Sequence, residues 1–239
     1  MATLAFLLQT AVVTRALFLV PFEGGRRYAA LAAAVRVDPA ARTRFFLRFL
    51  AQWWLTAAVV LASLALASEP LSSLKLAAAH GFAPWGLLGA WILALGFPLL
   101  RLDSGDFRAA LAAQLAKVPA ILPGTRRERL LFAAVSVTAG ICEELVFRGL
   151  VPAWSTKLLP ALQWLPAVLS IAGFGLAHAY QGLRGVVLTA LLGALLYAAM
   201  ALTGSLCVPM AMHALNDLRF LALVVALDRP LVNRPRDLP

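Results

Sequence analysis

Long apolar runs are the feature that most limits what this chain can fold into. The sequence contains repeated apolar stretches close to 20 residues in length, for example at 49–67 and 208–227, and about 20 such residues cross the hydrocarbon core of a bilayer as one helix. Hydrophobic residues make up 62% of the chain and charged residues 13%, whereas soluble domains contain about 45–50% and about 25%. The chain therefore lacks the polar surface of a soluble domain and the polar composition of a disordered segment. Two cysteines are too few for a disulfide scaffold. We expect an integral membrane protein.

The apolar runs predict an all-α fold, a polytopic transmembrane helix bundle of about seven spans, with six to eight as the range. The predicted spans are 2–22, 49–67, 83–100, 130–147 with a continuation toward 154, 161–180, 186–203 and 208–227. The first run is interrupted at Thr14 and Arg15, so an interfacial helix is the alternative there. If the run does span, the long Arg15 side chain can reach toward the polar side.

The basic residues predict the orientation and the partners. The chain has 21 Lys and Arg against 11 Asp and Glu, a net charge of +10. Arginines gather at 26–48, at 101–129, at Arg184 and in the tail, and alternation of the spans places all four groups on one side. By the positive-inside rule this side is cytoplasmic. We expect a lipid bilayer as partner and no nucleic acid. The Ala-, Leu- and Arg-rich composition favours a bacterial inner membrane, with the C-terminal tail in the cytoplasm.

One membrane domain is expected, in three stretches. Residues 1–127 supply membrane helices and basic loops, 128–227 supply a second group of helices, and 228–239 form a polar tail. Between the two helical groups, Phe107, Leu111 and Leu115 recur at helical spacing, which predicts a helix along the membrane surface. Cys142 and Cys207 both lie in apolar segments, so we predict buried thiols and no disulfide framework.

Polar residues inside the predicted spans indicate where function lies. An ionisable group in a spanning segment is costly and is by default a functional hypothesis. The second half of the chain contains seven such polar residues, which are Glu143, Glu144, Arg148, His178, His213, Asn216 and Asp217.

Helical spacing predicts how these residues relate to one another. Glu144 and Arg148 are four apart and can pair on one face, while Glu143 is turned about 100° away. Asp217 is four residues after His213, where a carboxylate can orient the imidazole. Glu143 and His178 are at nearly equal distances from a predicted turn near 160, so the two side chains should lie at the same depth in the membrane.

Two readings without proteolysis also account for polar residues in the spans. A buried network of ion pairs can simply fix the register of the helices in a non-catalytic membrane scaffold. A proton-coupled transporter component would use Glu and His as a proton relay. Neither explains why two adjacent carboxylates, an arginine four residues later and two separate histidines occur together.

Three ordered motifs in these spans resemble a known family. EELVFR, FGLAH and HALND match the EExxxR, FxxxH and HxxxB motifs of the CPBP family of intramembrane proteases, also called the type II CAAX prenyl protease or bacterial Abi family. The resemblance implies hydrolysis of a peptide bond in a membrane protein or peptide. It implies that Glu143 activates water with help from His178, and that His213 and the B residue, here Asp217, stabilise the oxyanion. Because a carboxylate is a poor oxyanion donor, Asn216 is the alternative donor, with Asp217 orienting His213.

A zinc-dependent protease with the same residues is the mechanistic alternative. Glu143, His178 and His213 could form a two-histidine, one-carboxylate site with an open water position. The helical zinc signature HExxH is absent from the sequence, so we predict a glutamate-type mechanism without a cofactor. The bacterial character of the composition favours a membrane-bound peptide or a protein-sorting tail as substrate over a prenylated protein.

Overall fold

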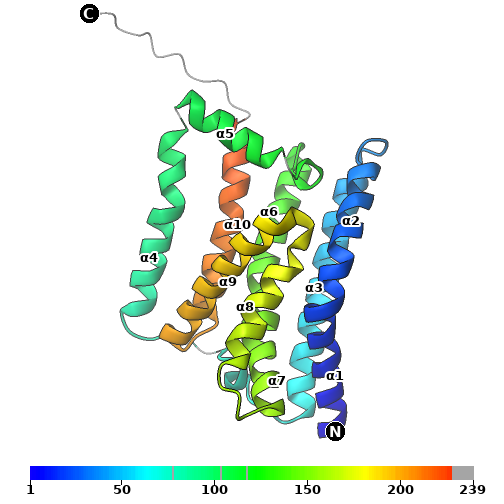
Figure 1. Cartoon of the computed structure of the whole chain (residues 1–239), viewed down its shortest axis with the longest axis vertical. Coiled ribbons are helices and arrows are strands. Elements are labelled where there is room, and N and C mark those ends of the chain that lie inside the picture. The colour runs from blue at the N-terminus through cyan, green and yellow to red at the C-terminus, as the bar shows by residue number, and fades with distance from the viewer. Residues whose placement is uncertain (77, 103, 117, 228–239) are drawn as a thin grey trace, which may run out of the picture.

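The computed structural model describes residues 1–76, 78–102, 104–116 and 118–227, and these residues form helices and no strand. The predicted tail, 228–239, lies outside the described residues. Six helical segments are long and apolar enough to cross a membrane. They are Ala2–Ala34, Ala41–Leu66, Ala83–Arg101, Arg126–Leu158, Ala179–Thr203 and Cys207–Leu227. The predicted polytopic bundle is confirmed, and Figure 1 shows these segments and the shorter α8 running roughly side by side.

The N-terminal segment is one long helix. α1 (Ala2–Thr14) continues through a π-helical stretch, η1 (Arg15–Leu19), into α2 (Val20–Ala34). The interruption that the sequence shows at Thr14 and Arg15 therefore changes the helical hydrogen bonding without ending the helix. α3 (Ala41–Leu66) returns beside it (Figure 1).

The next segments form the edge and one end of the bundle. α4 (Ala83–Gly96) passes into a 3₁₀ turn, η3 (Phe97–Arg101), and stands at the periphery (Figure 1). α5 (Gly105–Leu115) lies across the end of the bundle, as Figure 1 shows. Leu111 and Leu115 of α5 are buried and pack in a cluster with Leu223. The predicted helical repeat is confirmed, and its apolar residues cover the end of α10.

The central segment carries the first motif. α6 (Arg126–Glu144), the π-helical η5 (Leu145–Leu150) and α7 (Val151–Leu158) form one continuous helix. It begins at a capping box, in which Thr125 accepts from the Glu128 amide and Glu128 accepts from the Thr125 amide. This reciprocal bonding satisfies two amides that a helix start otherwise leaves free.

The last three helices pack closely against one another and against α6. α8 (Leu165–Ala177) is followed by a 3₁₀ turn, η6 (Ala179–Gln181), then α9 (Gly182–Thr203) and α10 (Cys207–Leu227). A Cβ on Gly140 of α6 would lie 2.7 Å from the Ala214 amide of α10, and one on Gly175 of α8 would lie 2.8 Å from the Ala190 Cβ of α9. Glycine thus lets these backbones approach, as small residues do between membrane helices.

Two sequence expectations need correction. The span predicted for 161–180 is shorter, because its helix begins at Leu165 and ends at Ala177. Cys207 is not buried: it lies at the exposed start of α10, whereas Cys142 is buried, and neither cysteine forms a disulfide.

Candidate active site

The predicted site residues come from three helices that meet beside one cavity. Glu143 and Glu144 end α6, and Arg148 lies in the π-helical η5 that follows. His178 directly follows α8, and α10 carries His213, Asn216 and Asp217. The cavity has a volume of about 990 Å³, and Glu143, His178 and Asp217 are among the residues that line it.

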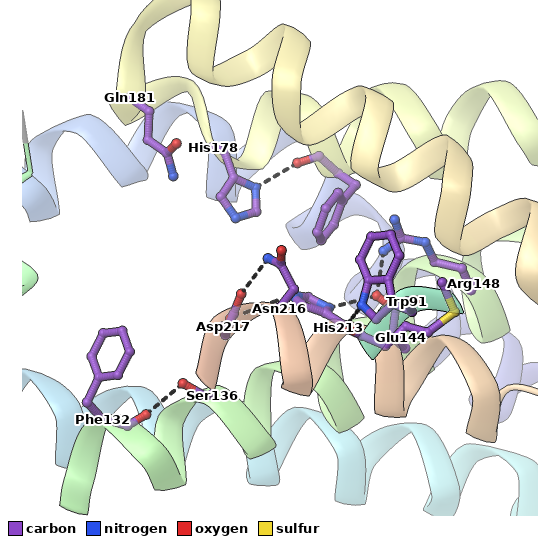
Figure 2. Close-up of polar contacts among 12 residues, drawn as sticks. Trp91, Phe132, Ser136, Glu144, Arg148, His178, Gln181, His213, Asn216 and Asp217 are labelled. Atoms are coloured by element: carbon purple, nitrogen blue, oxygen red, sulfur yellow. Dashed lines mark hydrogen bonds and ion pairs between the residues drawn. The ribbon is translucent and has the colours of Figure 1, made fainter. Parts of the chain in front are cut away.

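Glu144 is the centre of a buried polar cluster (Figure 2). Its Oε1 accepts from Arg148 Nη1 at 2.9 Å and lies 2.8 Å from His213 Nδ1. Glu144 and Arg148 are fully enclosed, and His213 is buried. The predicted pairing of Glu144 with Arg148 is therefore present, and it extends to a histidine on a different helix.

His213 has two acidic neighbours, of which the sequence predicts one. Asp217 Oδ2 lies 3.7 Å from His213 Nε2, within ion-pair distance but beyond hydrogen-bond distance. Glu144 makes the close contact instead, at Nδ1. Asp217 Oδ1 accepts from the Asn216 side-chain amide at 3.2 Å, so the Asn216 amide is already engaged by its neighbour.

Glu143 has different surroundings from Glu144. It lines the cavity with 8% of its surface exposed, whereas Glu144 has none exposed. Within the described part of the chain, no hydrogen bond or ion pair reaches the Glu143 carboxylate. Two adjacent carboxylates are thus separated in role, because one is bonded inside the protein and the other is free to meet a ligand or water.

His178 is held in one orientation by its own helix. Its Nδ1 lies 2.9 Å from the Phe174 carbonyl oxygen, one turn earlier (Figure 2). A carbonyl oxygen can only accept, so Nδ1 carries the proton of this bond and the neutral ring leaves Nε2 unprotonated. The ring lines the same cavity as Glu143. The structure brings the two residues to one cavity, and no direct contact between them is among the described contacts.

Phe174 separates the two histidines and supports the buried arginine. Its ring centroid is 4.9 Å from that of His178 and 5.5 Å from that of His213. The Arg148 guanidinium lies 4.0 Å above the same ring, a favourable cation–π distance. A Cβ on Gly193 of α9 would lie 3.1 Å from Arg148 Nη2, so this glycine leaves room for the guanidinium.

Helix α4 contributes a further contact that sequence reasoning missed. The Trp91 indole donates to the Met212 carbonyl at 2.8 Å, one residue before His213 (Figure 2). No local spacing predicts this bond, because it joins segments 121 residues apart.

The N-terminal helices form much of the cavity wall, which the sequence reading also missed. Aromatic residues of α3 line it, among them Phe45, Phe46 and Trp53, and Tyr28 lines it from α2. Arg15 of η1 is a lining residue as well. The signal available in the sequence was Arg15 itself, a charged residue inside the first apolar run.

The zinc alternative requires Glu143, His178 and His213 to converge as ligands. In the described residues, no group of three or more His, Cys, Asp or Glu side chains has an arrangement that could hold a metal ion. The Nδ1 atoms of His178 and His213 contact protein acceptors, so Nε2 is the nitrogen of each ring that could meet a ligand.

A comparison with models of protein families supports the resemblance. Residues 125–219 match the model of the type II CAAX prenyl endopeptidase Rce1-like family. The match supports a CAAX/CPBP family intramembrane protease. The match begins at Thr125, the capping residue of α6, and ends two residues after Asp217, so it contains all seven polar residues predicted from the sequence.

The match covers 95 of the 239 residues, and α1 to α5 lie outside it. No curated protein and no solved structure matches the chain significantly. The family match supports a CAAX-type endopeptidase that acts on membrane-associated substrates, and the six apolar helices indicate a multi-pass membrane protein.

Proposed function

We propose that this protein is a glutamate-type intramembrane endopeptidase in which Glu143 activates the attacking water. The observation that carries the proposal is the contrast between the paired carboxylates. Glu144 is bonded to Arg148 and His213. Glu143 lines the cavity, and among the described residues no hydrogen bond or ion pair engages its carboxylate. A general base needs such access to the proton that it removes.

His178 assists at the same cavity. With Nδ1–H donated to the Phe174 carbonyl, Nε2 is the nitrogen left to accept a proton or to orient the water. In the proposed reaction, water attacks the peptide carbonyl carbon as Glu143 takes its proton. The tetrahedral intermediate then collapses with cleavage of the C–N bond, and the leaving amine receives the proton that Glu143 took from water, either directly or through His178 Nε2.

His213 supplies the stabilisation of the oxyanion in this proposal. Glu144 holds Nδ1–H and thereby fixes the ring, so that a protonated Nε2–H can be donated to the developing negative charge. Arg148 holds Glu144 in place. Asn216 and Asp217 flank His213 on the same helix, and Asp217 keeps the Asn216 amide oriented.

The cavity favours an apolar peptide of a membrane protein or membrane-bound peptide as substrate. Its wall includes Phe45, Phe46, Trp53 and Phe132, which bury large apolar surfaces. The matching family is described as a prenyl endopeptidase. The bacterial character of the composition favours a substrate without a prenyl group.

We also propose that the basic end of the bundle faces the cytoplasm of a bacterial inner membrane. Three basic parts of the chain lie toward the same end of the bundle in Figure 1. They are the loop between α2 and α3, helix α5, and the turn η6 with the start of α9. Positive residues favour the cytoplasmic side. A single cysteine at Gln181, without Cys142 and Cys207, should react with an impermeant thiol reagent in inverted vesicles, and reaction in intact spheroplasts would reverse the orientation.

The catalytic proposal is tested by cleavage of a quenched fluorogenic library of apolar peptides by purified protein. Glu143→Gln and His178→Ala should each lower turnover by about 100-fold or more, since each removes a proton-transfer group. Glu69→Gln is the matched control, because Glu69 is a partly exposed carboxylate that pairs with Lys157 and does not line the cavity. Turnover by Glu143→Gln at the wild-type rate would refute the role of Glu143 as the general base. Proton-coupled flux without cleavage would favour a transporter, and an unchanged cellular phenotype in Glu143→Gln would favour a scaffold.

A further inference from the structure

Arg15 is a charged residue near the middle of a membrane-spanning helix. It lies in the segment Ala2–Ala34 and outside the region that matches the family. A charge at such a position is costly, and arginines within membrane helices usually face a cavity or the bundle interior and pair there. Its position therefore calls for a ligand or a partner.

The local structure turns Arg15 toward the catalytic cavity. Arg15 begins η1, and π-helical turns of this kind occur frequently at functional sites. Its neighbour Ala16 is buried in a core cluster that also contains Phe147 and Phe174, and Leu17 packs against that cluster. Arg15 itself lines the cavity together with Glu143 and His178.

Five arginines line this cavity, and Arg15 is the partly buried one among them, because Arg27, Arg44, Arg48 and Arg184 are exposed. Arg27 lies at an exposed position and bonds to Glu23 and Gln52, and Arg44 is paired with Asp38. In the described residues, no hydrogen bond or ion pair reaches the Arg15 guanidinium. The Arg15 guanidinium thus has N–H donors available for a ligand, on a membrane-spanning helix and at the wall of the cavity.

We infer that Arg15 binds a carboxylate of the peptide substrate and determines which peptides the cavity accepts. The inference rests on the proposed function. A guanidinium is a planar fork that matches a carboxylate with two parallel hydrogen bonds. The aromatic residues that share the lining would hold the apolar body of the same peptide. The carboxylate can come from the C-terminus of the peptide or from an Asp or Glu side chain.

Binding without turnover tests this inference. The protein carrying Glu143→Gln is placed in nanodiscs of zwitterionic phosphatidylcholine, so that anionic lipids do not compete. The probes are three dansyl-labelled apolar hexapeptides with a free C-terminal acid, with a C-terminal amide, and with an amide plus one internal Glu. Energy transfer from tryptophan reports binding, since Trp53 lies in the cavity wall.

We expect at least one of the acidic peptides to bind about tenfold more tightly than the uncharged amide. The peptide that does so identifies the source of the carboxylate. Adding Arg15→Gln should abolish the preference, and Arg15→Lys should retain part of it, since lysine keeps the charge without the fork. Arg26→Gln is the matched control, because Arg26 lies on the same helix, is exposed and is not a lining residue of the cavity.

Equal binding of all three peptides would overturn the inference, and so would a preference that survives Arg15→Gln. Failure of the proposed function is distinguishable. A protein that prefers the acidic peptides through Arg15 but cleaves none of the library refutes the protease proposal alone. A protein that cleaves peptides without any preference for an acid refutes the role of Arg15 alone.

Discussion

The segments Ala2–Ala34 and Arg126–Leu158 are built alike and serve different purposes. Each is a 33-residue helix with a π-helical turn within it. Each also contains a Glu–Arg pair at i,i+4 spacing, Glu23–Arg27 in the first and Glu144–Arg148 in the second. Yet 56% of the most apolar window of the second segment is buried inside the protein, against 28% in the first.

The difference shows that local pattern and environment act separately. Spacing alone places each arginine beside its glutamate. In the N-terminal helix the pair is exposed, with side-chain exposures of 45% and 38%, so water screens it. In the central helix the pair is fully enclosed and is completed by His213 from another helix. The buried pair can therefore organise a site, whereas the exposed pair cannot.

The largest expected effect comes from breaking the two pairs. Glu144→Gln should lower the free energy of unfolding by about 3–5 kcal/mol, because it leaves the Arg148 charge buried without its counter-ion. Glu23→Gln should cost less than about 1 kcal/mol, as exposed pairs do. Thermal unfolding in detergent, monitored by size-exclusion fluorescence, measures both. Equal losses would show that the enclosure of the central pair has no energetic consequence.

A smaller effect is expected from glycines in the same two helices. Gly140→Ala should destabilise by about 1–3 kcal/mol, since its Cβ would press on α10 beside His213. Gly25→Ala in the N-terminal helix should be neutral or stabilising by up to about 1 kcal/mol, because nothing lies within 4 Å of the added methyl group. The same unfolding assay compares the two variants. A neutral Gly140→Ala would contradict the close approach of α6 and α10.

The smallest effect concerns the direct bond between the two long helices. The Trp154 indole donates to Thr10 Oγ1 at 2.9 Å. A double-mutant cycle of Trp154→Phe and Thr10→Val should give a coupling energy of about 1 kcal/mol, typical of one hydrogen bond. A coupling energy of zero would indicate that the helices are held together by apolar packing alone.

Much of the fold could be predicted from the sequence, because apolar length is a local property. The spans near 49–67, 83–100 and 208–227 follow from composition alone, and the helices there are α3, α4 with η3, and α10. The span predicted at 161–180 is too long, because an apolar run does not by itself mark where a helix begins. The helix there begins at Leu165. The sequence does not decide whether the first run spans, because a π-helical turn has no plain sequence signature.

In the candidate site too, contacts within one helix could be predicted from the sequence, whereas contacts between helices could not. The Glu144–Arg148 pair was predictable from spacing within one helix, and the structure contains it. The contact of Glu144 with His213 was not, because it depends on how closely α6 and α10 pack at Gly140. The placement of Arg15 in the cavity wall also depends on packing between segments far apart in sequence. The catalytic roles of Glu143 and His178 remain predictions.

The central claim, hydrolysis by Glu143 without a metal, is tested most directly by the activity of chelator-treated protein. Purified wild-type protein is dialysed against a strong chelator, its metal content is measured, and peptide cleavage is assayed beside Glu143→Gln. The account predicts undiminished cleavage by metal-depleted wild type and loss of cleavage in Glu143→Gln, since the base is the carboxylate itself. Loss of wild-type cleavage on chelation, restored by added zinc, would contradict it.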